Sequence, residues 1–255
     1  MTLGLPLSTL YAFLLVLARV GGFITFLPVP GFRSAPDQVK ILLALAISLA
    51  LFPVWPSLPN AEPSISQLTA WAITEAGFGL TAGLAVSFLT EAFQLAAQAA
   101  GLQAGYGFAT TIDPTSEADA GVLQALASIF SGTLFFTTGM DHQLIRILAE
   151  SFVRFPAGSW APQAASLDGI VRLGSEMLSV GLRLALPVIA LLILIDFSLA
   201  LLGRVQQQLH LLSMAFPVKM AVSLAILAAL APVVPKMFSA AAEHTLAVLR
   251  QALAP

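Results

Sequence analysis

Long apolar blocks separated by short polar connections make up most of this chain. Three blocks run for 21 residues without a charge: Ile41–Ala61, Ala92–Ile112 and Ala120–Met140. An uncharged apolar run of about 18 residues or more is long enough to be a membrane-spanning helix. Four more blocks hold only one or two charges, namely Leu5–Pro28, Leu68–Thr90, Met177–Leu202 and Leu211–Val234. The pattern predicts about six apolar helical segments.

The blocks are expected to be helices and not strands. Inside lipid every backbone amide needs an internal partner, so chains cross a membrane as helices or as closed barrels. Barrel strands alternate apolar and polar residues over about ten positions, whereas these Leu- and Ala-rich blocks do not alternate. No composition break and no repeat of about 20 to 50 residues divides the chain. The sequence therefore predicts an all-α, membrane-associated fold in a single domain, 1–255.

One stretch, Leu68–Ile112, holds 45 residues without a proline. As a single helix it would be about 67 Å long, against a hydrocarbon core of about 30 Å. It is therefore either a hairpin bent near Glu91 or a helix that projects well beyond the bilayer. Either form differs from a simple helix that crosses the bilayer once, and the segment suggests a protein that is not embedded in lipid in the usual manner.

Composition supports a membrane environment. Hydrophobic residues make up 58% of the chain and charged residues 9%, against about 25% charged residues in a typical soluble domain. The net charge of -2, without a basic run, gives no support for nucleic-acid binding. The chain has no cysteine, which excludes disulfides and thiolate zinc sites. Met1–Ala18 holds no Lys or Arg, which favours a retained first membrane helix over a cleavable signal.

Ionisable residues inside the apolar blocks are the first candidates for a functional role. Each would cost roughly 2.5–3.5 kcal/mol at a bilayer centre. They could form an ion or proton pathway. They could instead pair inside a protein assembly, or lie near helix ends and reach water, and the sequence favours these structural roles over a pathway. The six residues are Arg19, Glu75, Glu91, Arg183, Asp196 and Lys219.

Small and polar residues recur at helical spacing in the same region. Gly79 and Gly83 follow Glu75 at intervals of four, a spacing that lets helix backbones approach closely in membranes. Further along, a polar and small stripe shares one helix face. It packs against another helix or faces an aqueous pore, and both interpretations stay open. The stripe consists of Glu91, Gln94, Gln98, Gly101 and Gly105.

The segment Gly105–Glu117 has an unusual composition. Two glycines alternate with two aromatic residues, and an Asp-Pro step then ends the helical pattern. Glycine gives backbone freedom and the aromatic rings give bulk, so the segment could form a movable constriction. An ordinary junction between a helix and a loop has the same pattern. The residues concerned are Gly105, Tyr106, Gly107, Phe108, Asp113 and Pro114.

Signals for an enzyme are poor. His142, His210 and His244 lie far apart and form no pair with the spacing of metal ligands. The sequence contains no phosphate-binding loop and no nucleophile–base set that merits a proposal. We expect no catalytic activity, no metal and no cofactor.

Five groups of motifs follow one another in a recognisable order, and together they cover nearly the whole chain. They are Arg19-Val20-Gly21-Gly22 with Pro28, Pro30-Gly31-Phe32, Pro36 and Lys40; Gly101 to Pro114; Phe135-Phe136, Asp141-His142, Ser151-Phe152 and Phe155-Pro156; Ala185-Leu186-Pro187 to Asp196 with Leu201-Leu202-Gly203-Arg204; and Phe216-Pro217-Val218-Lys219. In this order and spacing the chain resembles the FliR family of flagellar export proteins, whose relatives belong to type III secretion injectisomes.

The resemblance implies one subunit of a helical export gate, built from helical hairpins that lie largely within the assembly. It implies partners in the P-type and Q-type export-gate subunits, the B-type switch protein and the A-type export protein, with secreted polypeptides as substrates. It implies a place in the bacterial inner membrane, in the flagellar basal body. It also implies that Gly105–Glu117 is a plug loop, with Tyr106 and Phe108 as plugging groups.

Two other functions compete with a flagellar export gate. An injectisome subunit of the same family would share these motifs. A secondary transporter would place a site near the bilayer midplane, using Glu91, Arg183 or Asp196, but the sequence lacks the inverted repeats that favour such a transporter. The motifs do not distinguish a flagellum from an injectisome, and only the general likeness to the family favours the flagellar gate.

Overall fold

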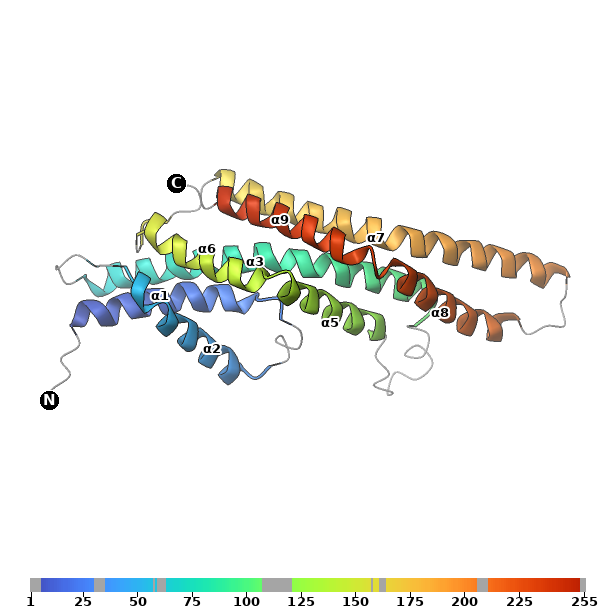
Figure 1. Cartoon of the computed structure of the whole chain (residues 1–255), viewed down its shortest axis with the longest axis horizontal. Helices are drawn as coiled ribbons and strands as arrows, with labels where there is room; N and C mark the ends of the chain where they lie inside the picture. The colour runs from blue at the N-terminus through green and yellow to red at the C-terminus, as the bar shows by residue number, and fades with distance from the viewer. Residues whose placement is uncertain are drawn as a thin grey trace. The chain divides into compact units, whose positions relative to one another are not determined.

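The computed structural model describes residues 6–29, 35–56, 58, 63–106, 121–156, 158–160, 164–205 and 211–252. These residues form eight α-helices and one short 3-10 helix, and they contain no strand (Figure 1). In chain order the elements are α1 (Leu7–Thr25), α2 (Asp37–Ala50), η1 (Phe52–Val54), α3 (Ile65–Ala104), α5 (Val122–Thr137), α6 (Met140–Arg154), α7 (Ala164–Val205), α8 (Leu211–Leu230) and α9 (Val234–Ala252). The prediction of an all-α fold is confirmed.

Three helices are long and apolar enough to cross a membrane: α1, α3 and the Asp168–Arg204 part of α7. Two bent pairs, α5 with α6 and α8 with α9, pass the same test only when each pair counts as one span. The described part of the chain therefore offers between 3 and 5 candidate spans, fewer than the segments that the apolar pattern predicts.

The uncharged block Ile41–Ala61 accounts for part of this difference. α2 ends at Ala50, and Pro53 follows within η1. Proline has no N–H with which to continue a helix and fixes its own φ angle. The prediction of one spanning helix over this block is therefore wrong, because length and hydropathy alone do not register the proline.

α3 runs unbroken for 40 residues. At a rise of 1.5 Å per residue it is about 60 Å long, about twice the hydrocarbon thickness of a bilayer. Between Gly83 and Gly101 the sequence has neither Gly nor Pro and consists mainly of good helix formers. The alternative of a hairpin bent near Glu91 is therefore wrong, and the alternative of one long helix holds.

α3 ends in a glycine cap. Gly105 has a φ of 87°, in the left-handed region that favours glycine. Its N–H donates to the carbonyl of Leu102 at 3.2 Å, and the N–H of Tyr106 donates to that of Gly101 at 3.1 Å. This pair of bonds is the Schellman arrangement that closes many helices. A side chain at Gly105 would also meet the ring of Phe216.

The chain divides into two compact units. Unit 1 consists of Met1–Phe88, Phe135–Gly174 and Ala242–Pro255, and unit 2 consists of Leu89–Leu134 and Ser175–Ala241. Four continuous helices, α3, α5, α7 and α9, contribute one part to each unit.

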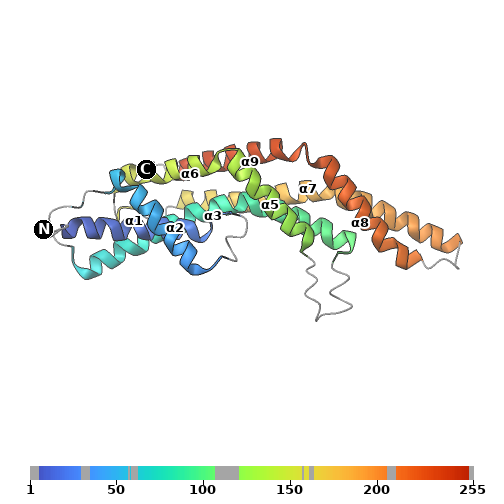
Figure 2. The same ribbon diagram turned by 60° about the horizontal axis from the view of Figure 1, so that its bottom comes forward.

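In unit 1, α1 packs on the first part of α3 through glycines (Figure 2). A Cβ atom on Gly22 would overlap the carbonyl oxygen of Ala76, and one on Gly79 would overlap that of Arg19. Gly83 stands equally close to the backbone of Phe23. The close approach expected from the four-residue spacing of Gly79 and Gly83 is therefore present.

The short helices α2 and η1 complete this side of unit 1. α1 packs against α2, and η1 contacts both α2 and α6. The Trp55 ring lies 5.4 Å from the Phe13 ring, centroid to centroid, and its indole N–H donates to the Ser48 carbonyl at 2.9 Å. A single aromatic residue thus ties the end of η1 to both α1 and α2.

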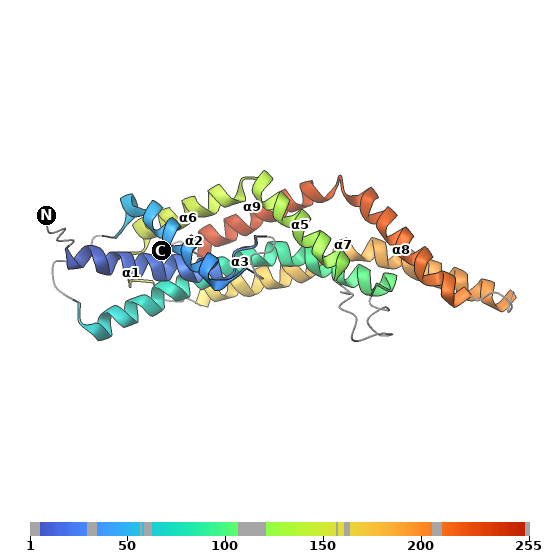
Figure 3. The same ribbon diagram turned by 90° about the horizontal axis from the view of Figure 1, so that it is seen from below.

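In unit 2, α3 and α7 meet in a cluster of buried apolar residues. Ala100 and Ala104 of α3 pack with Val188 and Leu192 of α7, and Leu227 of α8 packs against them. α7 and α8 run side by side along this part of the chain (Figure 3). Both helices continue through an internal proline, Pro187 in α7 and Pro217 in α8.

Neighbouring glycines in α1 provide a matched test of the contact between α1 and α3. Gly21 has open space where a Cβ atom would lie, so Gly21→Ala should be neutral or stabilise by up to about 1 kcal/mol. Gly22→Ala should destabilise by about 1–3 kcal/mol, because its methyl group would push α1 away from the Ala76 carbonyl. Thermal unfolding of the purified protein measures both, and equal stability of the two variants would contradict this packing.

Candidate functional site

Arg19 and Glu75 form an ion pair in the interior of unit 1. Arg19 comes from α1 and Glu75 from α3, and their side chains are only 0% and 1% exposed. The Nε atom of Arg19 donates to Oε2 of Glu75. Nη1 donates to the Ser151 hydroxyl at 2.8 Å, and Nη2 donates to the Phe155 carbonyl at 3.2 Å.

The remaining groups around this pair are also satisfied. Oε1 of Glu75 accepts the N–H of Gly158 at 2.9 Å. The rings of Phe78 and Phe152 lie against the guanidinium group, with centroids 4.5 and 4.3 Å from Cζ, an arrangement that attracts a cation to the ring faces. We name the five polar partners Arg19, Glu75, Ser151, Phe155 and Gly158 the Arg19–Glu75 hub.

The hub connects four segments of unit 1. A guanidinium and a carboxylate each lose several kcal/mol of hydration free energy when they are buried. Their mutual attraction and the hydrogen bonds to Ser151, Phe155 and Gly158 offset that loss. Because these partners come from α1, α3, α6 and the segment after α6, the charges are satisfied only when all four segments are in place.

Unit 2 holds a second and more exposed pair. Nζ of Lys219 in α8 lies 2.9 Å from Oδ1 and 3.0 Å from Oδ2 of Asp196 in α7. Nε2 of Gln103 donates to Oδ2 of Asp196 at 3.1 Å. The Lys219 side chain is 11% exposed and that of Asp196 is 43% exposed. Asp196 thus receives hydrogen bonds from two helices while one side of it stays open.

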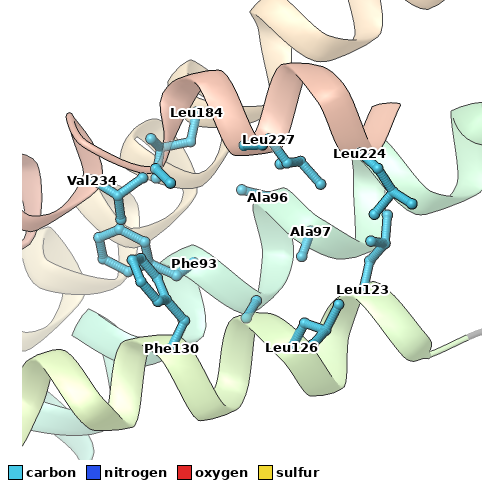
Figure 4. A pocket seen from close by; sticks show the side chains of 13 residues that line it. Phe93, Ala96, Ala97, Leu123, Leu126, Phe130, Leu184, Leu224, Leu227 and Val234 are labelled. Atoms are coloured by element: carbon cyan, nitrogen blue, oxygen red, sulfur yellow. The ribbon is translucent and has the colours of Figure 1, made fainter. Parts of the chain in front are cut away.

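Unit 2 also contains an apolar groove of about 350 Å³ (Figure 4). Residues of α3, α5, α7, α8 and α9 line it, among them Phe93, Phe130, Leu184, Leu224 and Val234. Every lining residue is apolar. The groove can therefore accommodate apolar groups, but it offers no side chain for acid–base or metal chemistry.

A family model described as bacterial export proteins, family 1, matches residues 10–245 of the chain. The flagellar biosynthetic proteins FliR of Escherichia coli (strain K12) and of Pectobacterium carotovorum are each 32% identical to it. These matches cover 89% of this chain and 87% and 85% of the relatives, respectively. The chain belongs to the FliR family. The Yop proteins translocation protein T of Yersinia pestis is 26% identical over 84% of this chain and 83% of its own length.

Membership of the FliR family confirms the resemblance drawn from the motifs. The chain is a component of a type III export apparatus with a membrane location. Its partners therefore belong to the same complex. The family is a structural part of this apparatus and not an enzyme family.

The structure brings four of the six predicted membrane charges together in two pairs, Arg19 with Glu75 and Asp196 with Lys219. Glu91 is half-buried on α3 and has a polar partner as well. Arg183 differs from the others, because it is exposed on α7 and makes no ion pair or hydrogen bond to another residue that the structure describes.

The stripe on α3 does not have a uniform environment. Glu91 and Gln94 are half-buried, Gln98 is exposed and Gly101 is buried. A Cβ atom on Gly101 would lie 3.6 Å from Leu123 of α5, so the stripe packs against a neighbouring helix at that end. Its member Gln98 has an exposed side chain.

Only the beginning of the predicted plug loop lies within the described residues. Gly105 is the cap of α3, and Tyr106 packs against the buried cluster of α3 and α7 in unit 2. The hydroxyl of Tyr106 donates to the carbonyl of Met220 in α8 at 3.4 Å. Gly107, Phe108, Asp113 and Pro114 lie outside the described residues.

Three partners in the Arg19–Glu75 hub were missed by reasoning from the sequence. Ser151 contributes a hydroxyl, while Phe155 and Gly158 contribute only backbone atoms. Ser151 and Phe155 stand in a motif of the family resemblance, which could have marked the region. The backbone contacts carry no side-chain signal. Within the described chain, no three His, Asp or Glu side chains are placed so that they could hold a metal ion.

The hub predicts a large loss of stability when one charge is removed. Arg19→Met should destabilise unit 1 by about 3–5 kcal/mol, because Glu75 would keep a buried charge without its partner. Thermal unfolding and the level of protein in the membrane measure the loss. Replacing Glu75 by Leu in the same chain should recover part of the stability, since no charge then stays buried.

Arg172 provides the control for Arg19→Met. It pairs with Asp168 at 2.9 Å on the surface of α7, where the two side chains are 76% and 60% exposed. Arg172→Met should change stability by less than about 1 kcal/mol, because exposed pairs contribute little. If Arg19→Met were as mild as this control, the assignment of the hub would be wrong.

Proposed function

We propose that this chain is a channel-forming subunit of the flagellar type III protein export gate in the bacterial inner membrane, where it passes unfolded flagellar proteins. The surface of α7 is the observation that supports the proposal most directly. Asp168–Arg204 has the highest mean hydropathy of the three candidate spans. Yet only 17% of its most apolar 18-residue stretch is buried within the chain. A helix with this surface requires lipid or the helices of other subunits around it.

The exposed apolar residues of α7 extend over much of its length. They are Leu178, Leu182, Leu186, Leu191, Ile193, Leu194, Phe197, Leu201 and Leu202. In α1 and α3, by comparison, 39% and 50% of the corresponding 18-residue stretch is buried. α7 is therefore the least buried of the three candidate spans, as expected for a subunit that other subunits complete.

The length of α3 supports the same proposal. A helix of about 60 Å cannot lie wholly within a hydrocarbon core of about 30 Å unless it tilts strongly. Its apolar residues beyond that core need protein contacts. An assembly of several subunits supplies them, and such an assembly can surround a conduit.

The flagellar assignment rests on the relatives. The two FliR proteins are each 32% identical to the chain, and the Yersinia translocation protein is 26% identical. An injectisome gate is the second candidate for the same reason. As partners in the gate we propose the P-type and Q-type subunits, with the B-type switch protein and the A-type export protein beside them.

The plug belongs to this proposal as well. Tyr106 packs against the buried cluster of unit 2 and donates a hydrogen bond to the Met220 carbonyl. Its position at the end of α3 is therefore fixed. The residues that follow, up to Glu117, close the channel at rest. Phe108 is the aromatic group that we assign to the closure.

Cross-linking to a stalled substrate tests the conduit. The chain has no cysteine, so Gln98→Cys introduces a single thiol at the exposed member of the α3 stripe. An export substrate with a folded domain at its end and cysteines along its length should form disulfides with this thiol. Gln38→Cys, at an exposed glutamine of α2, is the control and should give at most background. Equal cross-linking at both positions would argue against a conduit lined by α3.

Removal of the plug is a separate test. Deletion of residues 107–111, which leaves Tyr106 in place, should preserve assembly and make the membrane permeable to ions and small molecules. Dye release or ion conductance of cells that express the variant measures the leak. A deletion variant that assembles normally and does not leak would show that the segment is only a junction between helices.

A further inference from the structure

Arg183 is a cation on an apolar helix, and its side chain has no polar partner in the part of the chain that the structure describes. It lies on α7 within the apolar block Met177–Leu202, and it is exposed. None of the described residues forms an ion pair or a hydrogen bond with its side chain. An isolated charge at such a position costs roughly 2.5–3.5 kcal/mol at a bilayer centre, so pairing with an acceptor would lower the free energy of the chain in a membrane.

The other cations in the apolar blocks follow a different pattern. Arg19 is buried and paired with Glu75, and Lys219 is nearly buried and paired with Asp196. In each case the carboxylate lies on another helix of the same chain. Arg183 has the same kind of sequence environment as these two, but no carboxylate among the described residues pairs with it.

A backbone carbonyl that lacks its usual helical partner lies at the same point of the helix. Pro187 follows Arg183 by four residues inside α7. Because proline has no N–H, it cannot make the helical hydrogen bond to the Arg183 carbonyl. The position therefore presents a guanidinium donor and a backbone acceptor together.

The surface beyond Arg183 is apolar and contains a small residue. Leu186 and Leu194, three and eleven residues further along, share the face of Arg183, and they are 57% and 58% exposed. Ala190 stands between them and is also exposed. Small residues let another helix approach closely in a membrane, so this face is suited to a helix.

An anionic lipid headgroup fits the position less well than a second helix. Arg183 lies six residues, or about 9 Å, inside the apolar block. Glu176, two helical turns before it on the same face, carries a carboxylate at the polar end of the block. A phosphate near that end would meet the negative charge of Glu176 before it reached Arg183.

We propose that Arg183 is the recognition point on this chain for a second membrane subunit. The partner is a largely apolar helix that carries one Asp or Glu, packs along Leu186, Ala190 and Leu194, and pairs its carboxylate with the guanidinium of Arg183. This inference rests on the proposed function, since it concerns how the gate is assembled.

Capture of the partner subunits from native membranes tests the inference with four variants of the tagged full chain. Arg183→Glu and Arg183→Leu should each lower the captured amount more than about tenfold, equivalent to about 1.4 kcal/mol. Arg183→Lys keeps the charge and should retain most of the capture. Arg172→Glu changes an exposed arginine of the same helix that already has a partner on α7, and it should leave capture unchanged.

Two single-cysteine variants that keep Arg183 test the contact by cross-linking. Leu186→Cys places a thiol on the exposed face, and Val188→Cys places one at a buried position, 1% exposed. Leu186→Cys should cross-link to cysteines along an acid-bearing helix of a gate subunit, and Val188→Cys should not. Replacement of that acid by Arg in the partner should restore capture by Arg183→Glu.

The outcomes separate this inference from the proposed function. If the unaltered chain captures no export subunit, the proposed function is wrong. If it captures them, while Arg183→Leu captures as much and Leu186→Cys gives no cross-link, only the role of Arg183 is wrong. Normal capture by Arg183→Leu together with weaker binding to anionic vesicles would identify a lipid contact instead and would overturn the inference.

Discussion

A guanidinium with no access to water must satisfy its donors inside the protein, and unit 1 is organised around this requirement. Arg19 stands where α1 and α3 approach so closely that Gly79 meets the carbonyl oxygen of Arg19 itself. That approach brings the side chain of Arg19 to Glu75 on α3. Ser151 and Phe155 then accept hydrogen bonds from the guanidinium, and the N–H of Gly158 donates one to the carboxylate. Helix packing and charge pairing therefore depend on one another.

The three cations in apolar helices show how burial and partnership are related in this chain. Arg19 is fully buried and has four kinds of contact, and Lys219 is nearly buried and shares Asp196 with Gln103. Arg183 is exposed on α7, the least buried of the three candidate spans. A self-contained bundle would satisfy all three internally. A subunit of a larger assembly satisfies only those that its own helices cover, and this agrees with membership of the FliR family.

The α3 helix and the Ile41–Ala61 block illustrate the strength and the weakness of an apolar pattern. Hydropathy identifies both as apolar, but it does not say where a helix ends. In α2 the helix ends because prolines follow, and in α3 it continues past Glu91 because no residue there interrupts the backbone hydrogen bonds. The end at Gly105 could be predicted from the glycine pattern, whereas the contact of Tyr106 with Met220 could not.

The sequence by itself determined the helical class, the membrane character, the absence of cysteine chemistry and the family. These follow from composition, from periodicity and from the order of motifs, all of which are local properties of the chain. Only the tertiary structure decided that Arg19 pairs with Glu75, 56 residues away, while the Arg183 side chain forms no ion pair or hydrogen bond with a described residue. Ion pairing depends on which helices lie in contact, and that depends on packing along the entire chain. A charge in an apolar block is therefore visible in the sequence, but its partner is not.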